Sequence, residues 1–149
     1  MLLFRIEQFH FGISIAENAK CFRAVEIISV PSSIDSITGV VNYHSALVPV
    51  LDIRKKLGIA PKILSAGDSM IYLAEGDSPL IIVVDEILDV QTVTPSEIKH
   101  TQQQSANSSI TGIFSKEGKD ILMLDTHKLL LQSEIEDLNS LLKSMNKEI

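Results

Sequence analysis

The chain has 149 residues, a 45% apolar content and a net charge of −6, which suits one folded domain and argues against binding to nucleic acid. Its single cysteine, Cys21, cannot form an internal disulfide and suits a reducing compartment. The first residues lack a secretory signal pattern and no apolar run reaches transmembrane length, so we expect neither secretion nor membrane insertion.

The N-terminal part of the chain predicts three strands. Residues 2–6 and 9–15 form a predicted hairpin around a Glu7-Gln8 turn, because the second segment alternates apolar and polar side chains. Residues 24–30 are rich in β-branched side chains, so we expect a third strand that ends at Pro31.

A segment of 22 residues then occurs twice. Residues 36–57 align without a gap to residues 109–130, at a constant offset of 73 residues and with eight identical positions. Each copy predicts two strands, joined by a turn at His44-Ser45 in the first copy and at Glu117-Gly118 in the second. This regularity predicts that the chain has two halves of similar structure.

Glycines and aspartates mark the boundaries within each copy. Gly39 and Gly112 have a backbone freedom that permits a tight approach to the strand pair. Asp52 and Asp125 follow the second strand, where they would cap the helical turns 53–57 and 126–131. We therefore expect the copies to superpose as units of strand, strand and helical turn, related by a pseudo-twofold axis.

The connector 60–68 contains Pro61 and Gly67 and places a lobe boundary near residues 58–69. Beyond it the sequence predicts strands at 69–74, 80–84 and 87–93 and a capped helical turn that begins at Thr94. A final helix begins near Ser133, and we interpret its apolar stripe as packing on its own domain rather than docking on a partner.

About ten short strands in two groups of five, with helices only in turns and at the C-terminus, predict an all-β fold. The architecture that we expect is two small barrels side by side within a single domain of residues 1–149.

Residues with catalytic or metal-binding chemistry are scattered. The four histidines stand apart from one another and from Cys21, without the spacing of a metal site, and neither a G-x-S-x-G motif nor a phosphate-binding loop is present. Asp85, Glu86 and Asp89 follow a buried strand, and we interpret them as solvated carboxylates rather than as an acid/base pair. The sequence predicts no enzyme, no metal and no cofactor.

Two motifs of the first repeat copy form a longer pattern. Residues 39–42 read GVVN and residues 48–54 read VPVLDIR, which include Gly39, Pro49, Asp52 and Arg54. FGISI at 11–15, LIIVVDEILDV at 80–90 and ILMLDTHKLL at 121–130 stand in a matching order. Together these motifs resemble the CheW-like family of chemotaxis adaptors along nearly the whole chain, and the second copy carries Gly112 and Asp125 at the corresponding places.

The resemblance implies two SH3-like five-stranded barrels around one core and no enzymatic activity. It further implies a cytoplasmic scaffold that joins the regulatory domain of the histidine kinase CheA to the cytoplasmic tips of chemoreceptors.

The chain departs from the family pattern at two places on the receptor side. It has Asn42-Tyr43-His44-Ser45 where the family has Asn-Leu-Arg-Gly, and Asn18-Ala19-Lys20-Cys21 where the family has Val-x-Glu-Ile. The resemblance places the receptor contact at Asn18, Lys20, Asn42, Tyr43 and His44. These departures define either a changed partner surface or tolerated surface substitutions.

Three classes of function remain open on the sequence. The adaptor is the leading hypothesis. A regulatory domain that binds a small ligand, or another protein, in the crevice between the lobes is the alternative, and an enzyme comes last.

Overall fold

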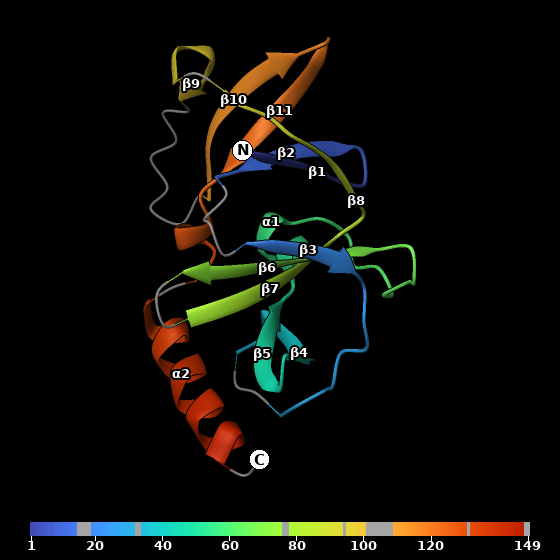
Figure 1. Ribbon diagram of the computed structural model, residues 1–149. Coiled ribbons are helices and arrows are strands. Elements are labelled where there is room, and N and C mark those ends of the chain that lie inside the picture. Colours follow the sequence, from blue (N-terminus) through green and yellow to red (C-terminus); the bar gives the residue numbers. More distant parts are fainter. Residues whose placement is uncertain are drawn as a thin grey trace. The chain divides into compact units, whose positions relative to one another are not determined.

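The computed structural model describes residues 1–14, 19–31, 34–75, 78–93, 95–100, 109–130 and 132–147. Within these residues the chain forms eleven strands in two sheets, three short helical turns or helices and a long C-terminal helix (Figure 1). The predicted class, mostly β with short helical turns and a C-terminal helix, is confirmed. The strands divide into six and five rather than into two groups of five, and the pairings among the described residues leave both sheets open.

The first sheet belongs to a unit made of residues 1–15 and 84–129, called here the six-stranded unit. Its order is β8-β1-β2-β11-β10-β9, and only the neighbours β2 and β11 run parallel. Its elements are β1 (Leu2–Ile6), β2 (Phe9–Ile13), β8 (Glu86–Val90), η1 (Pro95–Glu97), β9 (Lys99–His100), β10 (Ile110–Lys116), β11 (Lys119–Leu124) and η2 (Thr126–Lys128). Buried Phe4 and Phe11 stack in its core with ring centroids 5.6 Å apart.

The second sheet belongs to a unit made of residues 16–83 and 130–149, called here the five-stranded unit. Its order is β3-β6-β7-β5-β4, with β5 and β7 parallel. Its elements are β3 (Lys20–Arg23), β4 (Ile37–Tyr43), β5 (Ala46–Leu51), α1 (Ile53–Leu57), β6 (Ser69–Glu75), β7 (Ser78–Val84) and α2 (Gln132–Lys147).

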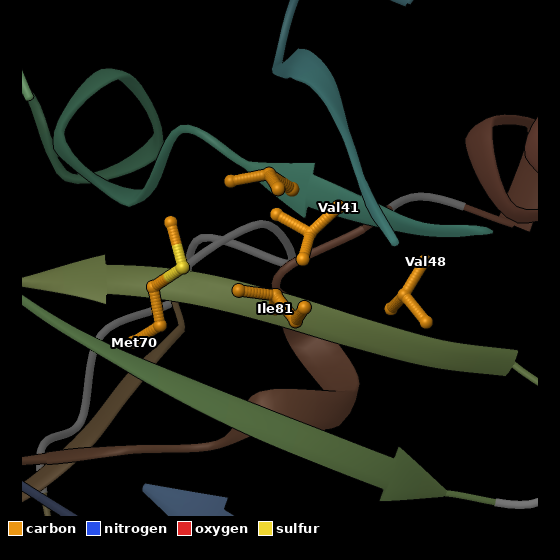
Figure 2. Close-up of a cluster of buried hydrophobic side chains, with 5 residues drawn as sticks. Val41, Val48, Met70 and Ile81 are labelled. Atoms are coloured by element: carbon orange, nitrogen blue, oxygen red, sulfur yellow. The ribbon is translucent and has the colours of Figure 1, made fainter. Parts of the chain in front are cut away.

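Aliphatic side chains from four strands form the core of the five-stranded unit. Figure 2 shows Val41, Val48, Met70 and Ile81 gathered in one cluster, to which buried Val50 also belongs. Alternation along each strand places these side chains on one face of the sheet. The C-terminal helix α2, red in Figure 1, packs against β5 and buries Leu138 and Leu142, which confirms the packing interpretation of its apolar stripe.

The two repeat copies have the same pair of strands, residue by residue, followed by an α-helical turn in the first copy and a 3-10 turn in the second. β4 and β10 begin at Ile37 and Ile110, which are 73 residues apart, and each strand carries a bulge before its glycine, Gly39 or Gly112. The turn residues of both copies have positive φ, 49° at His44 and 68° at Ser45 in the first and 52° and 77° in the second. The order of strand, strand and helical turn predicted for each copy is confirmed.

Both predicted aspartate caps are present. The Asp52 carboxylate accepts a hydrogen bond from the backbone N–H of Lys55 at 3.2 Å, at the start of α1. The Asp125 carboxylate accepts one from the N–H of His127 at 3.0 Å, at the start of η2. Gly58, with φ of 72°, ends α1 in the left-handed conformation that favours glycine.

The prediction of a third strand at residues 24–30 is wrong. That segment forms no strand. Its backbone makes an isolated bridge, in which Ile28 and Val40 exchange hydrogen bonds of 2.8 and 2.9 Å, and the N–H of Ala24 donates one of 2.9 Å to the carbonyl of Asp68. The third strand is β3, whose residues pair with β6 although their sequence shows no alternation. A long-range ladder therefore outweighs the β-branched composition of the neighbouring segment. The hairpin prediction is correct to Ile13, and Ile15 lies outside the described residues.

The predicted lobe boundary near residues 58–69 also needs correction. Although β6 and β7 follow the connector 60–68, they belong to the sheet of β4 and β5, because β7 pairs with β5 through Val50–Ile81 and Leu51–Ile82. The chain instead divides at 15/16, 83/84 and 129/130. The predicted helical turn appears as η1, while Thr94, its predicted cap, lies outside the described residues. In the described part of the chain, no helix is both long and apolar enough to cross a bilayer.

Candidate interaction surface

Four of the five residues expected on the receptor side lie on two strands and a turn of the five-stranded unit. Lys20 begins β3 and is exposed, Asn42 and Tyr43 end β4, and His44 begins the turn to β5. Asn18 lies outside the described residues. The site can therefore be built from Lys20, Tyr43 and His44 and their neighbours.

Tyr43 lies at the centre of a stack of three aromatic rings. Its ring centroid is 5.5 Å from that of Phe22 on β3 and 4.5 Å from that of Tyr72 on β6, with interplanar angles of 24° and 17°. The His44 ring meets the Tyr43 ring edge-on, at 4.3 Å and 80°. Offset or edge-on contacts at these separations are favourable because of the ring quadrupoles. The stack joins β4, at one edge of the sheet order, to β3 and β6 at the other.

Lys20 joins this cluster through the ladder of β3 and β6. Lys20 lies directly opposite Tyr72, and residues opposite each other in an antiparallel pair point to the same face. Asn42 does not join it: its side chain is exposed and, by alternation along β4, points to the face opposite that of Tyr43. The structure thus brings Lys20, Tyr43 and His44 together around Tyr72 and separates Asn42 from them.

A groove of about 680 Å³ lies beside Tyr43 and Tyr72. It is formed by the β4–β5 hairpin, by the facing parts of β6 and β7 and by α2. Its lining residues are Tyr43, His44, Ala46, Leu47, Val48, Tyr72, Pro79, Asn139, Leu142 and Lys143. Val48 and Leu142 are buried, whereas His44 and Lys143 are exposed, so the groove has an apolar base and polar groups on its rim.

The sequence did not point to Phe22, Tyr72, Asn139, Leu142 and Lys143 as site residues. Tyr72 shares the parity of buried Met70 on β6, a weak signal that it lies on the core side of the sheet. Asn139, Leu142 and Lys143 stand at positions i, i+3 and i+4 of α2 and so share a face. Only the fold brings that face to the hairpin.

The glycine of the first motif has a packing role. A Cβ at Gly39 would overlap the carbonyl oxygen of Ile28 and would lie 2.8 Å from Cγ2 of Ile27. The positive-φ glycines of the described residues are Gly58 and Gly118, so Gly39 serves the close approach of the segment around Ile28 rather than an unusual backbone angle.

The other motif residues support the strand and helix that follow. Pro49 on β5 is buried and pairs with Val40 on β4. The side chain of Arg54 is buried in α1, where its Nη1 donates a hydrogen bond of 2.9 Å to the carbonyl of Ala60. Arg54 therefore ties α1 to the start of the connector. Among the described residues, no group of three or more His, Cys, Asp or Glu side chains is arranged to hold a metal ion.

Comparisons with known proteins agree on one family. The family model described as a CheW-like domain matches residues 1–134. The chain is 27% identical to the chemotaxis protein CheW of Bacillus subtilis over 133 residues, which cover 87% of this chain and 85% of that protein. It is 25% identical to CheW of Klebsiella aerogenes over 146 residues, which cover 96% and 88% of the two chains.

A solved structure matches the fold as well. The crystal structure of the scaffolding protein TtCheW from Thermoanaerobacter tengcongensis matches with a TM-score of 0.75 at 21% identity, covering 86% of this chain and 89% of that one. At this identity the match concerns the fold alone, and the family model provides the assignment. The chain belongs to the CheW-like family.

Proposed function

We propose that this chain, a chemotaxis coupling adaptor of the CheW-like family, joins the regulatory domain of a CheA histidine kinase to the cytoplasmic tip of a chemoreceptor. It acts in the cytoplasm as a scaffold, without catalysing a reaction. The receptor contacts the surface around Lys20, Tyr43 and His44. The family resemblance also assigns Asn18 and Asn42 to the receptor side, although the side chain of Asn42 points to the other face of β4.

The observation that supports this surface is the aromatic stack with its two basic neighbours. Tyr and other aromatic side chains that are half-buried present a large, rigid contact area at a low entropic cost, which is why they are enriched in protein interfaces. Lys20 and His44 flank the stack on β3 and on the turn after β4. A receptor segment with apolar and acidic side chains would complement such a surface.

The test is a pair of binding titrations at low salt. Purified chain is titrated with the regulatory domain of the kinase and, separately, with a receptor-tip fragment, both from the organism that supplies the chain. An adaptor binds both fragments and converts neither of them. Absence of binding to either fragment would contradict the proposal.

A double substitution tests the residues of the surface. Lys20→Glu together with His44→Arg restores the charges of the family pattern at these two positions. If the departures define this chain's own partner, the double variant binds its native receptor tip more weakly and binds the kinase domain as before, since a mismatched charge at a desolvated contact repels. An unchanged receptor affinity would assign the substitutions to tolerated surface variation.

A further inference from the structure

We propose that the C-terminal helix α2 makes one wall of a docking groove, and that this groove takes an apolar side chain of the receptor-side partner that is flanked by a carboxylate. The inference rests on the proposed adaptor function and concerns the same end of the five-stranded unit. It adds α2 and the groove as determinants of which receptor segment binds.

The groove has the lining of a site for an apolar side chain, and its volume leaves room for the neighbouring residues of the same segment. Its volume of about 680 Å³ lies between a hairpin wall that carries Tyr43 and a helix wall that carries Leu142. Buried Val48 and Leu142 supply apolar contact at the base, and Tyr72 adds a ring face. An apolar side chain that leaves water for such a groove gains roughly 25 cal/mol per Å² of area buried.

The rim determines which charge can accompany that side chain. Lys143 lies on the rim and is exposed, and within the described residues its ammonium group makes no salt bridge. The imidazole of His44 lies on the hairpin side, and none of the described lining residues is acidic. A carboxylate next to the apolar side chain would find a partner there, whereas a second cation would be repelled.

The helix wall is held in place before any partner binds. Glu134, in the first turn of α2, accepts a hydrogen bond of 3.0 Å from the Ser36 hydroxyl and forms an ion pair of 2.7 Å with Lys56 on α1. Leu138 and Leu142 are buried where α2 packs against β5. A fixed wall lowers the cost of ordering the site on binding.

The wall also lies outside the part of the chain that the family model matches. That match ends at residue 134, whereas Asn139, Leu142 and Lys143 follow it. The hairpin wall therefore lies inside the part that the family model matches, and the helix wall lies beyond it. The helix wall nevertheless lies within the span shared with CheW of Klebsiella aerogenes, because that match covers 96% of this chain.

The first test obstructs the groove. Ala46 is exposed at the start of β5 and lines the groove, so Ala46→Trp occupies the space meant for the partner's side chain. Lys119 stands 73 residues later at the equivalent place of the second hairpin, so Lys119→Trp is the matched control. We expect Ala46→Trp to weaken binding of the receptor-tip fragment by about tenfold or more, and Lys119→Trp to leave it unchanged.

The second test reverses the rim charge. Lys143→Glu is expected to weaken the same binding by about tenfold at low salt, with a smaller loss at high salt, because the effect is electrostatic. Lys128→Glu, an equal charge change on an exposed residue of the six-stranded unit, is the control. Kinase-domain binding serves as the check of folding and stays unchanged in all four variants.

The outcomes separate the two proposals. A native chain that binds no receptor tip contradicts the adaptor function itself. If the native chain binds the tip and the Ala46→Trp and Lys143→Glu variants bind it equally well, the adaptor function stands and the groove proposal is wrong. Loss of receptor binding in both variants, with both controls unaffected, supports it.

Discussion

Asp52 and Asp125, 73 residues apart, make the same pair of contacts in their two repeat copies. The backbone N–H of Asp52 donates a hydrogen bond of 2.7 Å to the carbonyl of buried Ser36, and that of Asp125 donates one of 2.8 Å to Ser109. Each carboxylate then caps the helical turn that follows. Each aspartate thus links the first residue of its copy to the end of the second strand.

The first prediction concerns this cap. Asp52→Ala removes the acceptor of the Lys55 N–H and is expected to lower the free energy of unfolding by about 1 kcal/mol. Asp52→Asn keeps an acceptor oxygen and should stay close to the native value, since Asn is as good an N-cap as Asp. Urea unfolding of both variants measures the difference, and equal stabilities for the two would exclude the capping role.

The second prediction concerns Gly39. Gly39→Ala places a methyl group against the carbonyl of Ile28 and the side chain of Ile27, so we expect a loss of about 2 kcal/mol in the free energy of unfolding. Gly67→Ala is the matched control, because a Cβ there meets only the Ser65 hydroxyl at 3.8 Å. A thermal melt of the Gly39 variant that coincides with that of the control would refute the close approach.

The third prediction concerns the aromatic stack. Tyr43→Ala removes the ring that contacts both Phe22 and Tyr72, and we expect it to destabilise the chain by about 2 kcal/mol. Tyr43→Phe retains the ring and should be nearly neutral. Denaturant unfolding gives both values. Comparable losses in the two variants would assign the effect to the hydroxyl group instead of the stack.

The fourth prediction concerns Cys21. This thiol is exposed on the edge strand β3, yet partial burial raises its pKa, so the folded chain holds less thiolate at a given pH than the unfolded chain does. The thiol's contribution to stability is present below the unfolded pKa and is lost as the pH rises through the folded pKa.

Alkylation by iodoacetamide, followed by mass spectrometry, measures this difference. At pH 8 the native chain should react more slowly than the chain in urea, and its rate should continue to rise at higher pH. A native rate equal to the rate in urea would show that the environment of Cys21 leaves its thiol unperturbed.

Local signals in the sequence predicted the repeat units well. The turns at His44-Ser45 and Glu117-Gly118, the caps at Asp52 and Asp125 and the stripe of α2 each depend on residues close together in the chain. Such features follow from backbone preference and side-chain spacing, which a sequence displays directly. The family motifs then linked these units to one fold.

Pairings between distant segments were the features that the sequence did not reveal. Residues Lys20–Arg23 form a strand because they pair with β6, and their sequence shows no alternation of apolar and polar side chains. The observed lobe boundary differs from the predicted one because β7, which follows the connector, pairs with β5, which precedes it. The groove has the same origin, since Tyr72 and Lys143 are 71 residues apart and meet only through the packing of α2 on the sheet.

The parallel pair of β2 with β11 has a consequence for the order in which the chain can fold. β2 ends at Ile13, and the strand that it needs begins at Lys119, so the sheet of the six-stranded unit cannot be completed until most of the chain has been synthesised. Contacts of such sequence separation slow folding, because a long loop must close first. During synthesis the β1–β2 hairpin emerges first, and β2 has an unpaired edge until β11 is made. The strands β3 to β7 can pair with one another before that point.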